Sequence, residues 1–248
     1  MNFAPAAVAF FPGLAVGSFL NVVAARIPLR RSIVRPGSAC MSCGADLAWY
    51  DNVPLLSFAI LRGRCRHCQA VIPWRYPLVE AVTAFLVAGC VLKFGVSWEA
   101  AIAAFFCAAL VTVSATDIER FVIPNRVVLP AAAAVLVAQT LLHPSIEWVA
   151  ACFGASAFLL LAAFAYPAGM GMGDVKLALL LGAMLGRTVP VALMIGMVSA
   201  LVPATVLLAR HGSAARKMRI PFGPFLALGG VAALFAGHVL LNAYLGLL

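Results

Sequence analysis

Long apolar segments with few charges divide this chain and restrict the folds open to it. Of its 248 residues, 65% are hydrophobic and 10% are charged, whereas soluble domains carry about 25% charged residues. Runs of about 20 apolar residues match the hydrocarbon thickness of a bilayer. Their continuity predicts helices and not the alternation of a membrane barrel. We expect an all-α polytopic membrane protein with about eight transmembrane helices, at roughly 3–25, 77–95, 99–116, 127–142, 147–166, 175–187, 189–209 and 223–247.

The first apolar run lies at the N-terminus but lacks the basic segment that opens a secretory signal peptide, so we expect a retained span. The sequence then predicts three parts. Residues 1–25 form a first transmembrane helix, and residues 26–76 form a small cytoplasmic module. Residues 77–248 form a membrane domain of about seven helices.

The net charge of +9 is distributed unevenly along the chain. Of the 17 Lys and Arg residues, 15 fall in loops that share one side if the eight spans are right. By the positive-inside rule this side is cytoplasmic and both termini face outward. The basic surplus therefore predicts topology and an attraction to anionic lipid, and it requires no nucleic-acid partner. The loops are 26–75, 117–126, the segment around Lys176, and 210–222.

Four of the seven cysteines form a metal-binding pattern. Two Cys-x2-Cys pairs are separated by 21 residues, with Gly44 and Gly63 at nearby turns, and this spacing is typical of a structural four-thiolate zinc site. A disulfide is disfavoured in a reducing cytoplasm, while an iron–sulfur cluster remains an alternative. A module of about 50 residues buries little core, so a metal would stabilise its fold. The four cysteines are Cys40, Cys43, Cys65 and Cys68.

Two aspartates are expected at the same membrane depth. Asp117 follows the third span and Asp174 precedes the sixth, both on the predicted cytoplasmic side. Two neighbouring carboxylates that share a proton can activate water against a peptide bond. The alternative is that Asp174 is only a helix-start acid, since Asp favours the positive end of a helix.

Glycines precede Asp174 in the stretch YPAGMGMGDVKL, residues 166–177. Gly169, Gly171 and Gly173 would allow a substrate strand to approach the carboxylate closely. They fit a flexible loop equally well.

These motifs together resemble the type IV prepilin peptidase family of membrane aspartic proteases. The resemblance covers most of the chain. The similar segments, in order, are GSFLNVVAARIP (17–28), YDNVPLLSF (50–58), GRCRHC (63–68), RYPLVE (75–80), DIERFVIPN (117–125), GMGD (171–174) and IPFGPFLALG (220–229).

The resemblance implies an aspartic endopeptidase of the bacterial inner membrane that removes the basic leader of prepilins or pseudopilins at the cytoplasmic face. It also implies an N-methyltransferase that uses S-adenosylmethionine on the new N-terminus. Carried over, Asp117 and Asp174 are the catalytic pair, and the four paired cysteines bind zinc. We also expect Gly171 and Gly173 to give the extended peptide room, and Glu119 to help hold the basic leader.

Three other interpretations remain open. A presenilin-type protease shares the glycine–aspartate motif, but its partner motif is Tyr-Asp, whereas Asp117 follows Thr116. An ion- or proton-coupled transporter with a structural zinc module would usually carry its acids deeper in the spans. An assembly scaffold is the third. The sequence shows no Gly-rich nucleotide loop of the soluble type, and it leaves the S-adenosylmethionine contacts and the oligomeric state open.

Overall fold

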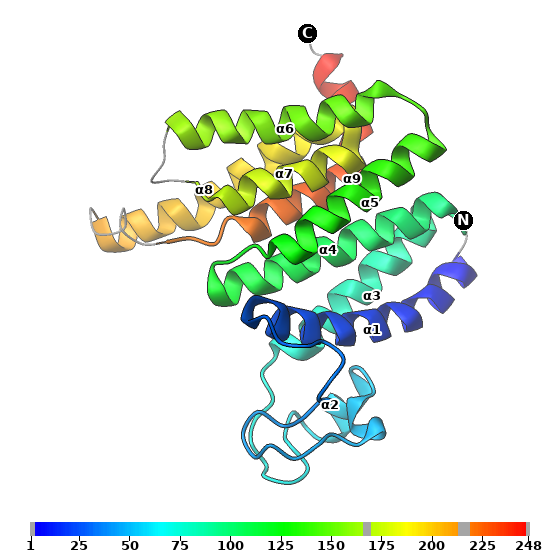
Figure 1. Ribbon diagram of the computed structural model, residues 1–248, viewed down its shortest axis with the longest axis vertical. Coiled ribbons are helices and arrows are strands. Elements are labelled where there is room, and N and C mark those ends of the chain that lie inside the picture. Colours follow the sequence, from blue (N-terminus) through cyan, green and yellow to red (C-terminus); the bar gives the residue numbers. More distant parts are fainter. Residues whose placement is uncertain (1–2, 166–169, 213–218, 247–248) are drawn as a thin grey trace. The chain divides into compact units, whose positions relative to one another are not determined.

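The computed structural model describes residues 3–165, 170–212 and 219–246, and within these ranges the chain is helical with no β-strand (Figure 1). This confirms the predicted all-α fold. The short elements are η1 (Ile27–Leu29), η2 (Trp49–Asn52), α2 (Leu56–Ile60) and η3 (Gly186–Thr188). The long helices are α1 (Phe3–Arg26), α3 (Arg75–Phe94), α4 (Trp98–Arg120), α5 (Asn125–Leu142), α6 (Ile146–Ala165), α7 (Met172–Leu185), α8 (Val189–His211) and α9 (Gly223–Leu245).

Among the described residues, seven stretches are long and apolar enough to cross a membrane, so the chain is a multi-pass membrane protein. Six of them contain one long helix each. The seventh, Met172–His211, spans 40 residues and contains both α7 and α8. With 14 residues α7 is about 21 Å long, which is shorter than a hydrocarbon core of about 30 Å. Long helices are thus present at all eight expected positions, but by length and composition they form seven candidate membrane spans and not eight.

Packing divides the chain into two compact units, Met1–Ala115 and Thr116–Leu248. The boundary falls inside α4, so that most of this helix belongs to unit 1 and its last turn belongs to unit 2. The sequence predicted a different division, into residues 1–25, 26–76 and 77–248. The two packing units do not test that division, so it stays a prediction.

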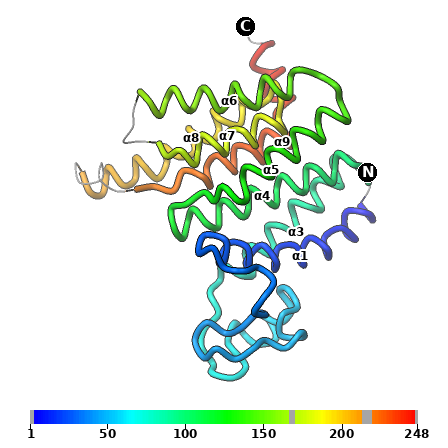
Figure 2. Tube along the Cα trace, in the orientation of Figure 1, coloured from blue at the N-terminus to red at the C-terminus, as the bar shows by residue number. Residues whose placement is uncertain are grey.

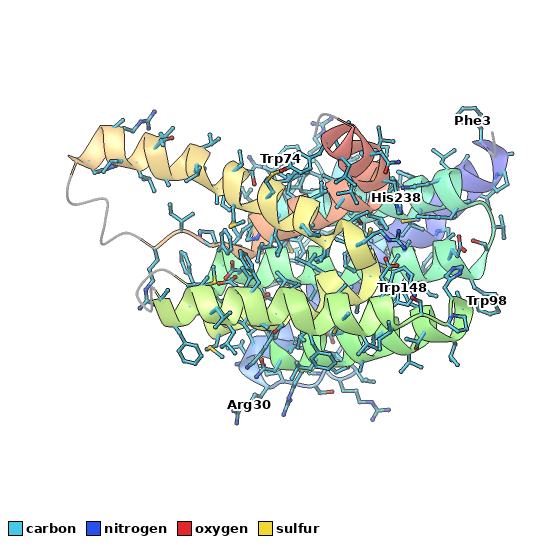
Figure 3. All side chains as sticks on the ribbon, turned by 90° about the horizontal axis from the view of Figure 1, so that it is seen from above. Phe3, Arg30, Trp74, Trp98, Trp148 and His238 are labelled. Atoms are coloured by element: carbon cyan, nitrogen blue, oxygen red, sulfur yellow. The ribbon has the colours of Figure 1, made fainter. Side chains whose placement is uncertain are left out.

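In unit 1, α1 packs against α3 through a pair of glycines four residues apart. A Cβ atom added to Gly13 would lie 2.8 Å from Ala84 Cα, and one added to Gly17 would lie 2.6 Å from Glu80 Cα. Glycines at this spacing let two membrane helices approach closely. Figure 3 labels Phe3 near the start of α1 and Arg30 just beyond its end. The apolar cluster between the helices of unit 1 contains Leu20, Ala24, Val79, Val111 and Ala115.

In unit 2, α7 is the central helix. It packs against α5 and α6, and α8 packs against α9 (Figure 2). Gly182 of α7 lies directly on the Ala151 carbonyl of α6, and Leu177, Leu180 and Leu181 are fully buried. A helix that is surrounded by other helices is apolar on all its sides. The burial of α7 therefore explains why its sequence is an almost continuous apolar run although the helix is short. Its N-terminus carries Asp174 into the interior of unit 2.

Candidate active site and metal centre

Asp117 is held inside unit 2 by a backbone amide from a distant segment. It lies in the last turn of α4 and is 6% exposed. Its Oδ2 atom accepts a 2.8 Å hydrogen bond from the N–H of Gly223, the first residue of α9. The first N–H groups of a helix lack partners within the helix and favour negative charge. A Cβ atom on Gly223 would lie 2.8 Å from the same oxygen, so this contact requires glycine.

Asp174 caps the helix on which it lies. It is 7% exposed and occupies the third position of α7. Its Oδ2 atom accepts a 3.1 Å hydrogen bond from the N–H of Gly171, and its own N–H donates to the Gly171 carbonyl at 3.1 Å. This reciprocal pair satisfies amide groups that a helix start leaves without partners. The predicted helix-start role of Asp174 is therefore present, and it fixes the orientation of the carboxylate.

The segments that carry the two aspartates pack directly on one another. A Cβ atom on Gly173 would lie 2.9 Å from Ile123 Cβ, in the loop that follows α4. Lys176 Nζ donates a 3.0 Å hydrogen bond to Asn125 Oδ1 at the start of α5. The segment that carries Asp117 and the segment that carries Asp174 are therefore direct neighbours in unit 2. Two acids 57 positions apart in the sequence thus share one buried site within unit 2.

The other residues predicted for this site have different surroundings. Glu119 lies on the last turn of α4 and is exposed. Gly171 supplies the amide that binds Asp174, and Gly173 allows the close approach of Ile123. Gly169 lies outside the described residues.

Gly223 is the residue of this site that sequence reasoning did not single out. The segment IPFGPFLALG contributes to the family resemblance, but no role for its glycine was predicted. The available signal is the Gly-Pro pair at the expected start of the last helix, because proline favours the first turn of a helix. That signal locates the helix start and says nothing about its partner, Asp117.

The four paired cysteines come together in unit 1 as predicted. Their sulfur atoms all lie within 4.8 Å of one another, and Cys40 Sγ lies 3.8 Å from Cys68 Sγ. A tetrahedron with Zn–S bonds of about 2.3 Å has sulfur–sulfur edges of about 3.8 Å. The donor set and its spacing therefore fit a single zinc ion, which these four thiolates would hold.

Two similar turns build this cluster. In each pair the N–H of the first cysteine donates to the carbonyl five residues later, at 2.9 Å. The residue after each second cysteine has a positive φ angle, +71° at Gly44 and +59° at Gln69. Gly63 has a φ angle of +68° and lies against the ring of Phe58. The predicted turns at Gly44 and Gly63 are confirmed. The turn at Gln69 was not predicted, because the sequence has no glycine at that position.

The backbone around the first pair favours a metal ligand. The N–H groups of Cys43 and Ser42 lower the pKa of the Cys40 thiol to about 6. A thiol with so low a pKa is largely a thiolate at neutral pH, and the thiolate is the form that binds metal.

An ion pair joins η2 to the second cysteine pair. Arg66 contacts both carboxylate oxygens of Asp51, with Nη2 2.7 Å from Oδ1 and Nε 3.0 Å from Oδ2. The Arg66 guanidinium holds the pKa of Asp51 below its ordinary value. This two-point contact fixes η2 beside the metal site.

The three remaining cysteines, Cys90, Cys107 and Cys152, are buried in helices. Cys90 and Cys107 lie on α3 and α4 of unit 1, with their sulfur atoms 4.0 Å apart.

Two family models together match most of the chain. The family model described as "Bacterial Peptidase A24 N-terminal domain" matches residues 11–94, and the model described as "Type IV leader peptidase family" matches residues 104–205. No solved structure matches the chain significantly. These matches give no support to the transporter alternative.

Curated relatives match along almost the whole chain. A protein of Bacillus subtilis (strain 168) named "Prepilin leader peptidase/N-methyltransferase" is 36% identical over 96% of this chain and 97% of its own length. Proteins of the same name from Burkholderia pseudomallei (strain 1026b) and Pseudomonas aeruginosa are 38% and 35% identical, over 93% and 94% of this chain and 85% and 91% of their own lengths. Since these matches cover nearly all of both sequences, the chain belongs to the type IV leader peptidase family.

Proposed function

We propose that this protein is a membrane aspartic endopeptidase that removes the basic leader of prepilins or pseudopilins and then methylates the new N-terminal amine. The observation that carries the proposal is the site in unit 2, where two buried aspartates from separate helices lie together, each bound by the N–H of a glycine. The names of the full-length relatives describe the same pair of activities.

The proposed peptidase chemistry follows from two neighbouring carboxylates. Such a pair does not ionise twice easily, so one member keeps a proton while the other carries the charge. The ionised aspartate takes a proton from water, whose oxygen attacks the scissile carbonyl. The protonated aspartate donates its proton as the peptide bond breaks. The amides of Gly171 and Gly223 hold Asp174 and Asp117 in place, so the pair is organised before substrate binds.

The substrate contacts are also part of the proposal. Exposed Gly171 and its neighbour Gly173 border Asp174 and leave room for an extended peptide. Glu119, exposed on the last turn of α4, offers a negative charge to the basic leader. The positive-inside rule favours a cytoplasmic position for this face in a bacterial inner membrane. The basic loops there would also contact anionic lipid, and no nucleic-acid partner is proposed.

The metal and the methyl donor have separate roles in this proposal. Zinc held by the four paired cysteines would stabilise the module, because all four ligand positions are taken by protein. S-adenosylmethionine, when bound, supplies an activated methyl group on a sulfonium.

Mass spectrometry of the N-terminus of a co-expressed prepilin tests both activities together. Wild-type protein is expected to yield a shortened chain with one added methyl group. Asp174→Asn is expected to yield the full-length precursor at the same expression level, because the amide side chain cannot share a proton. Glu99→Gln serves as a control that removes an acid outside the site. A shortened chain from the Asp174→Asn protein would exclude the proposed role of that residue.

A further inference from the structure

A cavity in unit 1 lies outside the aspartate site and has no assigned role. It measures about 230 Å³ and lies between the last turns of α1, the first turns of α3 and the cysteine module. Its walls are largely apolar, with Val22, Phe58 and Ile72 among them. A single water occupies about 30 Å³, so one bridging water does not fill this space.

Asn21 is one of the residues that line this cavity, and it carries an unpartnered acceptor. The residue is 3% exposed, and its Nδ2 atom donates a 3.1 Å hydrogen bond to the Tyr76 carbonyl. Among the described residues, its Oδ1 atom is the buried side-chain oxygen or nitrogen without a hydrogen-bond partner. Buried polar atoms without partners are rare in folded proteins, so a bound ligand that brings a donor would satisfy this oxygen.

Glu80 adds a carboxylate to the same wall. It is 9% exposed and lies on α3. Its Oε2 atom accepts a 2.9 Å hydrogen bond from the N–H of Leu55. This donor is neutral, and within the described residues no basic side chain forms an ion pair with Glu80. A buried carboxylate is stable when a cation pairs with it.

The backbone beside Glu80 is strained in order to reach it. Leu55 has a φ angle of +57° and a ψ angle of −44°, and Leu56 N–H donates to the Pro54 carbonyl across it at 2.6 Å. This is a γ-turn with positive φ, a rare and unfavourable conformation for a residue with a side chain. Such strain collects at ligand sites, where the surrounding contacts maintain it.

The arginines of the cavity wall are already engaged. Arg26 donates to the carbonyls of Ser32, Pro36 and Gly37, and Arg66 pairs with Asp51. The acceptors of Asn21 and Glu80 are therefore left for a ligand that brings its own positive charge.

We propose that this cavity binds the methyl donor, with the Asn21 and Glu80 oxygens facing the cationic groups of S-adenosylmethionine; the inference rests on the proposed methyltransferase function. The apolar walls suit the uncharged parts of the donor. A second cavity of about 340 Å³, within the size range of small-molecule sites, borders three of the same residues, Ser18, Val22 and Asn52. Loss of the methyl group converts the sulfonium into a neutral thioether, so the same charge that holds the donor favours release of the product.

Direct binding measurements on the purified full-length protein test this assignment. The probes are S-adenosylmethionine and S-adenosylhomocysteine, in nanodiscs of phosphatidylglycerol alone, which removes ethanolamine headgroups as a rival cation. Wild-type protein is expected to bind the charged donor at least about tenfold more tightly than the neutral product. Glu80→Gln keeps an acceptor for Leu55 N–H but removes the charge. It is expected to abolish most of this preference while the affinity for the product changes by less than about threefold.

Two further variants separate binding from folding. Asn21→Leu removes the unpartnered oxygen and is expected to weaken donor binding, whereas Glu99→Gln removes an acid elsewhere in unit 1 and should change nothing. Bound zinc and leader cleavage report an intact fold in each variant. An unchanged donor preference in Glu80→Gln, with methylation still present, overturns the assignment and leaves the proposed function standing. A wild-type protein that cleaves prepilin but neither binds donor nor methylates overturns the methyltransferase proposal itself, and the donor site with it.

Discussion

The cysteine module and the aspartate site achieve their geometry in opposite ways. The module brings four sulfurs together with short turns, each closed by hydrogen bonds within one Cys-x2-Cys segment. The aspartate site uses three segments, the end of α4, the start of α7 and the start of α9, and its hydrogen bond between Gly223 and Asp117 joins residues 106 positions apart.

This difference bears on how each site fails. A module built from local turns and a metal depends on the metal for its folding free energy. A site built from distant helix ends depends on close helix packing, which needs small residues at particular positions. Ligand removal should therefore damage the first site, and the addition of a single methyl group should damage the second.

The largest effect is expected from Cys65→Ser. Loss of one thiolate should reduce bound zinc from about one ion per chain to almost none, since the metal contributes about 10–16 kcal/mol in comparable four-ligand sites. Methylation should be lost with it, while leader cleavage stays within about threefold of wild type, because the aspartates lie in unit 2. Metal analysis and the prepilin assay measure the two outcomes, and Cys152→Ala is the control. Loss of cleavage together with zinc would break the contrast between the two regions.

Gly223→Ala tests the aspartate site with one added carbon. Its Cβ atom would lie 2.8 Å from Asp117 Oδ2, so the carboxylate must move and the hydrogen bond must lengthen. We expect leader cleavage to fall about 100-fold, which corresponds to about 2.7 kcal/mol in the barrier. Gly154→Ala on α6 is the matched control, because a Cβ atom there meets nothing within 4 Å. Equal activity in the two variants would show that the Gly223 contact is unimportant.

Substitution of the glycines before Asp174 is expected to reduce leader cleavage by a smaller factor, and it distinguishes two explanations for these glycines. Gly173→Ala places a Cβ atom 2.9 Å from Ile123 Cβ, whereas Gly171→Ala meets only ordinary contact at 3.4 Å. If packing decides, cleavage should fall about tenfold in the first variant and by less than about threefold in the second. If substrate access decides, both variants should raise KM by similar factors. Steady-state kinetics with a prepilin peptide separates the two explanations.

The smallest effect is expected from Asp51→Asn in the cysteine module. Because the folded-state pKa of Asp51 is lowered, its ion pair stabilises the module above the unfolded pKa of about 3.9. That stabilisation disappears as the pH falls through the folded value. The melting temperature of the variant should lie below that of wild type at neutral pH and converge with it below about pH 4. A difference that persists in acid would mean that Asp51 acts by packing and not by charge.

Sequence patterns reach these two regions to different extents. Cys-x2-Cys spacing fixes which sulfurs meet, because each pair is a single turn, and the sequence predicted all four ligands together with the turns at Gly44 and Gly63. The helices could be predicted equally well from the sequence, since the thickness of the bilayer sets the length of an apolar run. The short α7 shows a limit, because an apolar run does not reveal whether it spans lipid or lies buried among other helices.

The partners of the aspartates could not be predicted in the same way. Asp117 and Asp174 were recognisable as a pair through their shared predicted side, but their amide donors depend on which helix ends meet. No spacing rule connects Gly223 with Asp117. Asn21 and Glu80 are a similar case, since the cavity between them exists only after α1, α3 and the module have packed together.

The central claim, that Asp117 and Asp174 act as one catalytic unit, is tested most directly by a double-mutant cycle on leader cleavage. Asp117→Asn, Asp174→Asn and the double variant are compared under single-turnover conditions, with bound zinc measured in each sample. We predict that each single variant loses about as much activity as the double variant, because groups that act as a unit are strongly non-additive. Losses that add, or substantial cleavage by either single variant with zinc intact, would contradict the account.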